Sequence, residues 1–379
     1  MHIAFITPEY PIHNFKGNIG GIGTFTKSIA EQLMRNNINV TVFIHSQSIN
    51  SIVTENGIEV HFVKMKAVKG ITWYTNRRYF NKYVNNVISE KNIEVIESPE
   101  WTGFTAFMKF NCPLVIRLHG SDTYFCNLEK RKVKQKNKFF ERKALIAADK
   151  IVGVSQFVAN KTKELFKLNT TIEVIYNAID TEMFTPNHQY IKPKSVLYFG
   201  TLVRKKGVLE IAKMFNVLAE QDDETCLILL GKDNKDVFTG DSTLALIKEI
   251  LSEKAIKKTT YINAVPYKEV INYIQQSEVV LLPSFAEACP MTWLEAMALE
   301  KKMITSNIGW AKELMIDGQT GFTVNPKDTT EFTFKVLDLL NNEASSSLMA
   351  KQARNRIINK FDIKQSFAIN IAMYKLILK

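Results

Sequence analysis

The sequence predicts an α/β protein of two doubly wound, Rossmann-like domains that face each other across a cleft. The chain has 379 residues, of which 46% are hydrophobic, and this exceeds what one ordinary core holds. Short apolar runs rich in Val and Ile alternate with helix-like segments, which is typical of parallel strands buried on both faces. The alternation starts twice, on either side of a polar, proline-containing joint at residues 187–194. Two open parallel sheets are therefore expected.

The first series of elements occupies residues 1–190, which we assign to the N-terminal Rossmann-like domain. A glycine turn and a helix over residues 20–37 follow the first expected strand. The strands are expected at residues 2–7, 38–44, 93–98, 113–120, 149–155 and 171–177.

The second series occupies residues 191–355, the C-terminal Rossmann-like domain. The chain is helical in pattern from about Ser345 onward. We expect residues 356–379 to form a C-terminal helix that packs back toward the N-terminal domain. The strands of this series are expected at residues 195–200, 225–231, 259–265, 278–283 and 302–306.

Composition favours a cytoplasmic protein. The four cysteines at residues 112, 126, 226 and 289 are widely separated and form no C-x-x-C pair, so we expect reduced thiols. The first residues run directly into a strand pattern without a basic and then apolar leader, so no signal peptide is expected. No apolar stretch approaches the ~18–20 residues of a membrane span.

The positive charge is uneven. The formal net charge is +11, and residues 1–190 hold 24 Lys and Arg against 16 Asp and Glu. Two stretches, residues 64–83 and 129–143, mix basic with aromatic residues. They predict that the protein binds peripherally to the anionic inner face of a membrane. The alternatives are a solvated helix face and a genome that favours lysine. No nucleic-acid-binding motif accompanies the charge, so no nucleic acid partner is expected.

Ligands of open parallel sheets bind beyond the carboxyl ends of the strands. Gly20 and Gly21 follow the first strand and precede a helix, so their amides can approach a phosphate; the alternative is a tight turn. His119 ends the strand at residues 113–120. An ordinary, near-neutral pKa would let it donate a hydrogen bond to a sugar hydroxyl or assist proton transfer.

In the second series, a basic cluster follows the strand at residues 195–200. Arg204 and Lys206 lie just before Gly207 and a helix, a good position for a diphosphate clamp. The alternative is a solvated loop.

Two glutamates flank the start of another helix. Pro290 suits the first position of that helix, where the amides of Met291 and Thr292 would favour an anion. Glu287 lies in the preceding loop and Glu295 about one turn inside the helix. The pair could accept hydrogen bonds from a sugar and a ribose on either side of a bound diphosphate. Alone, Glu295 would read as a carboxylate that complements the helix dipole.

With these residues in place, the chain resembles a retaining glycosyltransferase of family 4, which has the GT-B fold. Glu287 to Glu295 matches its E-x7-E motif. The resemblance implies sugar transfer from a nucleotide diphosphate sugar to a hydroxyl of a glycan or lipid-linked acceptor, which the N-terminal domain would bind. The further matching segments are residues 20–25, 174–186, 199–207, 279–298 and 306–326.

The resemblance also implies roles for the candidate residues. Arg204 and Lys206 would neutralise the diphosphate, so neither a metal nor a cofactor is expected, and Asp233 and Asp236 are assigned to a surface turn. The remaining roles are ribose binding by Glu295, sugar and phosphate binding by Glu287 with the amides of Cys289, Met291 and Thr292, and a place beside the transferred sugar for His119.

The chain departs from the family pattern at several positions. Thr201 stands where an arginine is usual, and Arg204 is its candidate replacement. Ala288, Cys289 and Trp310 replace a glycine, an aromatic residue and a second glycine. The rival functions are a nucleotide-sugar epimerase or phosphorylase on the same fold, and a non-catalytic protein that binds nucleotide sugar or anionic lipid.

Overall fold

The computed structural model describes residues 1–13, 15, 17 and 19–379, which form two compact units. The first unit contains residues 1–177 and 364–379, and the second contains residues 178–363. Each unit is a mainly parallel sheet covered by helices, as the predicted fold class requires.

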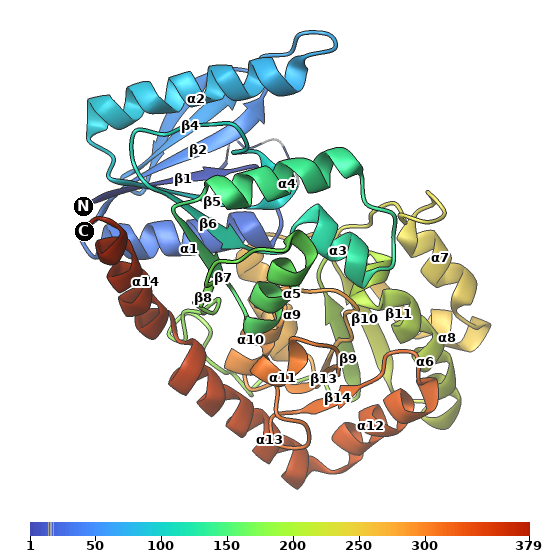
Figure 1. The fold of residues 1–379 in the computed structure, drawn as a ribbon. Helices are drawn as coiled ribbons and strands as arrows, with labels where there is room; N and C mark the ends of the chain where they lie inside the picture. The colour runs from blue at the N-terminus through green and yellow to red at the C-terminus, as the bar shows by residue number, and fades with distance from the viewer. Residues whose placement is uncertain (14, 16, 18) are drawn as a thin grey trace. The chain divides into compact units, whose positions relative to one another are not determined.

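Among the described residues, eight strands form the sheet of the first unit, in the order β3-β4-β2-β1-β5-β6-β7-β8. From β1 the chain builds outward on one side and then returns to add β5 on the other. Figure 1 shows helix α2 on one side of this sheet and α1 on the other. The strands are β1 His2–Thr7, β2 Asn39–Gln47, β3 Ser51–Glu55, β4 Ile58–Lys64, β5 Val95–Pro99, β6 Leu114–Leu118, β7 Lys150–Gly153 and β8 Glu173–Val174. The helices are α1 Gly21–Arg35, α2 Thr72–Lys91, η1 Trp101–Gly103, α3 Asp122–Leu128, α4 Gln135–Ala147, α5 Gln156–Phe166 and α14 Ile363–Ile377.

Strands β3 and β4 form an antiparallel hairpin at the sheet edge, which the sequence analysis did not predict. The connecting residues Asn56 and Gly57 have φ values of 52° and 79°. An Asn-Gly pair in this left-handed conformation favours a two-residue hairpin turn. The signal was therefore present in the sequence.

Helix α14 is part of the core of the first unit, although it comes last in the chain. Met373 and Tyr374 pack in one apolar cluster with residues of β1 and α1. Arg117 on β6 donates to Glu97 on β5 through Nε at 2.6 Å and Nη2 at 3.0 Å. Its Nη2 also donates to Oδ1 of Asn370 at 2.6 Å, and the Tyr374 hydroxyl donates to Glu97 at 2.7 Å. A buried ion pair therefore has two of its partners on α14.

In the second unit, six strands of the described chain form a parallel sheet in the order β11-β10-β9-β12-β13-β14. The strands are β9 Ser195–Phe199, β10 Cys226–Leu230, β11 Thr259–Ile262, β12 Val279–Leu282, β13 Lys302–Ser306 and β14 Phe322–Val324. The helices are η2 Arg204–Lys206, α6 Val208–Gln221, α7 Thr243–Ile250, α8 Glu253–Lys257, α9 Tyr267–Gln276, α10 Met291–Ala298, α11 Ala311–Leu314, α12 Thr329–Asn341, α13 Glu343–Arg356 and η3 Ile357–Phe361.

The second unit begins at Ala178, ahead of the polar joint at residues 187–194. The amide of Ile179 donates to the carbonyl of Phe361 at 2.9 Å, and Nη1 of Arg354 donates to the carbonyl of Phe184 at 2.7 Å. Residues 178–186 are thereby held by the end of the same unit, which explains why the division falls before the proline-containing segment.

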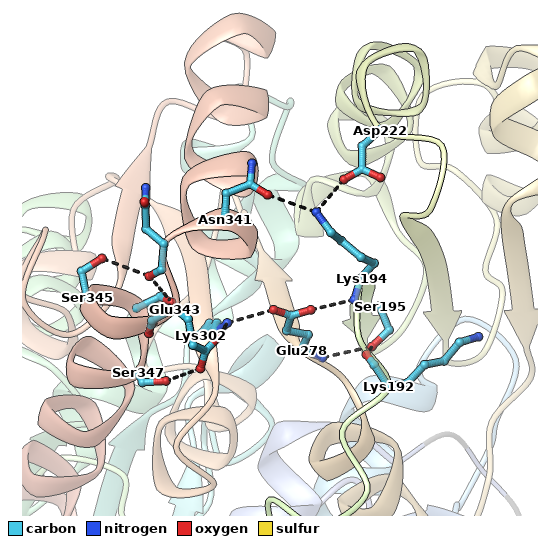
Figure 2. A network of polar contacts seen from close by, with 12 residues as sticks. Lys192, Lys194, Ser195, Asp222, Glu278, Lys302, Asn341, Glu343, Ser345 and Ser347 are labelled. Atoms are coloured by element: carbon cyan, nitrogen blue, oxygen red, sulfur yellow. Dashed lines mark hydrogen bonds and ion pairs between the residues drawn. The ribbon is translucent and has the colours of Figure 1, made fainter.

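A polar network closes the amino ends of the strands in the second sheet (Figure 2). Nζ of Lys302, the first residue of β13, lies 2.9 Å from Glu278 and 2.6 Å from Glu343. Glu278, which precedes β12, accepts from the amide of Lys194 at 2.6 Å. These contacts join the starts of three neighbouring strands to α13. They lie at the opposite end of the strands from the candidate site.

Candidate active site

The candidate site lies at the topological switch point of the second sheet. Strands β9 and β12 are paired in parallel at its centre. The chain continues from β9 toward β10 on one side and from β12 toward β13 on the other. The loops that follow β9 and β12 therefore separate at their shared edge, which is where open α/β sheets bind ligands.

The two loops pack directly on each other. Gly207 has a φ of 76°, and a Cβ built there would lie 2.2 Å from the carbonyl oxygen of Pro283. The amide of Phe285 donates to the carbonyl of Lys205 at 2.7 Å. Only glycine permits both this backbone conformation and this approach. The contact fixes the basic turn η2 against the loop that carries Glu287.

Lys206 and Glu287, both sequence-predicted site residues, form an ion pair across the two loops. The lysine side chain is about one-fifth exposed and the glutamate about one-tenth. The pair supplies a cation and a carboxylate, both reachable from solvent, at the switch point.

Glu295 lies on α10 and is 4% exposed. The hydroxyl of Tyr267, at the start of α9, donates to its Oε1 at 2.6 Å. Burial raises the pKa of Glu295 to about 7, while the Tyr267 hydrogen bond and the charge of Lys206 lower it. Lys206 therefore acts electrostatically on both glutamates of the E-x7-E motif. The carboxyl is balanced between its neutral and ionised forms near neutral pH.

The helix start differs by one position from the sequence prediction. Pro290 was expected as the first helical residue, but it is the N-cap, with φ −69° and ψ 120°, and α10 begins at Met291. Cys289 is buried beside it. The amides of Cys289, Met291 and Thr292 thus lie at the amino end of α10, between Glu287 and Glu295 in the chain.

Arg204 is engaged by a carboxylate that had been assigned to a surface turn. Its Nε and Nη2 lie 2.8 and 3.1 Å from the two oxygens of Asp236. Asp236 is only 3% exposed, and its pKa is lowered to about 2, first by the Arg204 hydrogen bonds. Asp233 accepts from Ser242 and from the amide of Leu244. Both aspartates therefore organise the protein's own loop rather than simply facing water.

In the first unit, the glycine turn already holds an internal anion. Oε1 of Glu9 accepts hydrogen bonds from the amides of Gly20 and Gly23, each at 2.9 Å. Burial raises the pKa of Glu9, and these two bonds lower it. Gly21 is exposed, with open space where a Cβ would be. A phosphate at this turn would have to share or replace the Glu9 carboxylate.

His119 follows β6 and is held by its backbone. Its amide and that of Gly120 donate to the buried Glu100 at 2.9 and 2.6 Å, and its ring centroid lies 4.7 Å from that of Phe25. Burial, followed by the charge of Arg117, lowers the pKa of His119 to about 3. The predicted near-neutral pKa is therefore wrong. The ring is neutral at physiological pH and is suited to hydrogen bonding rather than to proton donation.

Three residues near the predicted site were missed by sequence reasoning, namely Glu9, Glu100 and Tyr267, and Asp236 was given the wrong role. Glu9 and Glu100 each follow a strand of the first unit, so the strand-end rule could have found them. Tyr267 and Asp236 lie several residues beyond the ends of β11 and β10, and no local spacing points to their partners Glu295 and Arg204.

The described residues also bear on metal binding, membrane-spanning helices and disulfides. Within residues 1–13, 15, 17 and 19–379, no cluster of three His, Cys, Asp or Glu side chains is arranged to hold a metal ion. No helix in the same part of the chain is long and apolar enough to cross a membrane. The four cysteines, all described, form no disulfide.

Comparison with known proteins gives matches over most of the chain. Residues 180–356 match the family model of glycosyl transferases group 1, and residues 19–183 match glycosyltransferase family 4. An uncharacterized glycosyltransferase of Methanocaldococcus jannaschii is 27% identical over 332 residues, 86% of each chain.

Solved structures share the fold. Sucrose-phosphate synthase from Thermosynechococcus elongatus superposes with a TM-score of 0.83 at 16% identity, over 99% of this chain and 98% of that one. The Anabaena protein HepE in complex with UDP-glucose gives a TM-score of 0.73 at 18% identity, over 98% of this chain and 100% of that one.

Proposed function

Since the chain belongs to the GT-B glycosyltransferases of group 1 and family 4, we propose that it is a sugar-transferring enzyme. In this proposal a sugar passes from a nucleoside diphosphate sugar to a hydroxyl group, with retention of anomeric configuration. One observation carries the donor assignment. Lys206, Glu287 and Glu295 converge at the switch point of the second sheet. A diphosphate flanked by a sugar and a ribose presents the matching set of charge and hydroxyls.

Lys206 is the residue we assign to the departing diphosphate. Negative charge develops there as the glycosidic bond breaks, and a fixed cation stabilises the transition state more than the ground state. The lysine is paired with Glu287. Donor binding would divide its charge between the carboxylate and the phosphates. A cation in this place supplies the role that a metal fills in other phosphate sites, so we propose metal-independent transfer.

The two carboxyl groups take different hydroxyls in this proposal. Glu295, fixed by Tyr267, accepts from the ribose, and Glu287 accepts from the sugar. The amides of Cys289, Met291 and Thr292 add donors toward the phosphates and sugar. His119, in the first unit, is assigned to hydrogen bonding with a sugar hydroxyl rather than to moving a proton.

The acceptor in this proposal is a glycan or a lipid-linked carrier held by the first unit, and the protein works in the cytoplasm as a peripheral membrane enzyme. The Anabaena neighbour was solved with UDP-glucose, which supports a nucleotide-sugar donor. In this proposal, Cys289 and Trp310, which stand where the family pattern has an aromatic residue and a glycine, help to select the sugar.

A panel of nucleotide sugars tests the donor. A ligand present at 100 times its Kd adds about 2.7 kcal/mol to the free energy of unfolding, so the true donor should be the strongest stabiliser. Product analysis with the winning donor then distinguishes transfer from a rival activity. Turnover of the donor to an isomer with no acceptor present would identify an epimerase instead.

Two variants test the division of roles. Glu295→Ala should weaken donor binding, measured by calorimetry, whereas Glu287→Ala should mainly lower turnover. Wild-type donor affinity and wild-type turnover in both variants would refute these assignments. Glu249→Ala, an exposed glutamate on α7, is the matched control.

A further inference from the structure

The first unit carries an exposed row of aromatic side chains that crosses three separate segments. Phe107 lies between Trp73 of α2 and Phe139 of α4, with ring centroids 6.2 and 6.0 Å away. Trp73 is 37% exposed, Phe107 56% and Phe139 51%. Ile71 and Tyr74 extend the row and are also exposed. We call these four aromatic residues and the adjoining isoleucine the aromatic surface: Ile71, Trp73, Tyr74, Phe107 and Phe139.

The aromatic surface stands on a rigid support. A small core of Ala106, Phe140 and Ala144 lies beneath it. Nη2 of Arg77 donates to the carbonyl of Gly103 at 3.0 Å, and its guanidinium lies 4.3 Å from the Phe140 ring. These contacts tie α2, η1 and α4 together.

Phe107 is held outward at a conformational cost. Its φ is 65°, a left-handed conformation that is rare for a bulky residue. Helix α2 fixes the loop that follows it: Nδ2 of Asn81 and of Asn85 donate to the carbonyl of Lys109 at 3.0 and 2.9 Å, and the amide of Asn111 donates to Asn85 at 3.0 Å. Strain retained around an exposed aromatic side chain is typical of a functional position.

The charge around the aromatic surface is mainly positive. Residues 64–89, 101–121 and 130–140 contain no Asp or Glu. Glu141, within α4, is buried and accepts from the amides of Asp122 and Thr123. The exposed cations that adjoin the surface are Lys69, Arg78, Lys109, Lys136 and Lys143.

We propose that the aromatic surface is the face by which this protein docks on an anionic lipid bilayer. Aromatic rings favour the interface between headgroups and acyl chains, and lysines around them are attracted to anionic lipid. A large exposed apolar patch with a basic rim marks an interaction surface. The proposal rests on the proposed function for its biological meaning, because it brings the first unit to a membrane that holds a lipid-linked acceptor.

Vesicle sedimentation tests the proposal without any sugar transfer. We expect binding to vesicles of phosphatidylglycerol and phosphatidylcholine, little binding to phosphatidylcholine alone, and loss of binding as salt is raised from about 0.05 to 0.5 M. Phe107→Asn should weaken the partition about tenfold or more, since it removes an inserted ring. Asparagine adopts the left-handed conformation readily, so the variant should fold as well as the wild type.

Matched controls separate this surface from exposure and charge in general. Phe334→Ser removes a phenylalanine that is 63% exposed on α12, and it should leave vesicle binding unchanged. Lys136→Glu with Lys143→Glu should reduce binding about tenfold or more, whereas Lys248→Glu on α7 should not.

Three outcomes would overturn the proposal. The protein could fail to sediment with anionic vesicles at low salt, or the control variants could lose as much binding as the surface variants. In the third, light scattering would show a dimer that Phe107→Asn dissociates while vesicles are ignored, which would make the surface a contact between copies. If vesicle binding holds but no nucleotide sugar is turned over, the proposed function fails while the docking surface stands.

Discussion

Replacing Glu295 by glutamine should make the protein more stable above neutral pH. The carboxyl is buried, and its pKa is raised from 4.5 to about 7. Each pKa unit corresponds to 1.36 kcal/mol, so the ionised side chain costs the folded state roughly 3 kcal/mol relative to the unfolded chain. Glutamine keeps the shape and can still accept from Tyr267, but it carries no charge.

The sign follows from proton binding. Between pH 4.5 and about 7 the folded state holds the Glu295 proton more tightly than the unfolded state does. Its contribution to stability is therefore complete below pH 4.5 and is lost as the pH rises through about 7. Other carboxyl groups with raised pKa values, such as Glu100 and Glu141, titrate equally in both proteins and cancel in the difference.

Urea denaturation from pH 4.5 to about 8.5, followed by tryptophan fluorescence, measures this difference. Trp293 and Trp310 are fully buried in the same unit as Glu295 and report its unfolding. The free energy of unfolding of Glu295→Gln minus that of wild type should grow by roughly 3 kcal/mol over this range. A difference that stays flat, or that shrinks with rising pH, would refute the burial argument. Tyr267→Phe removes a hydrogen bond that lowers the pKa of Glu295. In this variant, stability should therefore fall at a higher pH than it does in the wild type.

Three further predictions concern the clamp, the loop contact and the core. Lys206→Met should lower kcat/KM by about 10²–10³ because a fixed cation is lost from the transition state. The control Lys213→Met, at an exposed lysine on α6, should leave kcat/KM unchanged. The wild-type enzyme should keep its activity in EDTA, and strict dependence on added Mg²⁺ would count against a lysine clamp. Gly207→Ala should destabilise the second unit by roughly 2–5 kcal/mol in thermal or urea denaturation, from backbone strain and overlap, and an unchanged midpoint would mean the loops can separate freely. Tyr374→Phe should cost the first unit about 1.5–3 kcal/mol, the value of a buried hydrogen bond to the charged Glu97. Equal stability would show that Arg117 alone satisfies that carboxylate.

The sequence was informative where one local pattern determines the outcome. Residues 279–282 are a continuous apolar run because β12 is buried on both faces, and the alternation of such runs with helices predicts parallel sheets. Glu287 and Lys206 were chosen as candidates because they follow strands, and parallel strands bring their carboxyl ends to one edge. The Lys206–Glu287 contact is a consequence of that rule.

The parts that sequence reasoning missed depend on contacts between distant residues. The partner of Glu295 is Tyr267, and that of Arg204 is Asp236; neither spacing repeats any local pattern. The pKa of His119 depends on burial and on Arg117, whereas residue type alone supplies only the ordinary value. Phe107 is apolar in sequence and would be placed in a core, yet its backbone conformation turns it outward.

The first unit is built from two separate segments of the chain, and this affects how it folds during synthesis. A ribosome completes residues 1–177 about 200 residues before it completes α14, which at 5–20 residues per second is an interval of roughly 10–40 s. During that interval the polar surfaces of Glu97 and Arg117 lack Tyr374 and Asn370, while the second unit, continuous in the chain, can fold as it emerges. The first unit should thus complete its fold only after residues 364–379 have been synthesised. Before then the nascent chain should be most vulnerable to proteases and most dependent on chaperones.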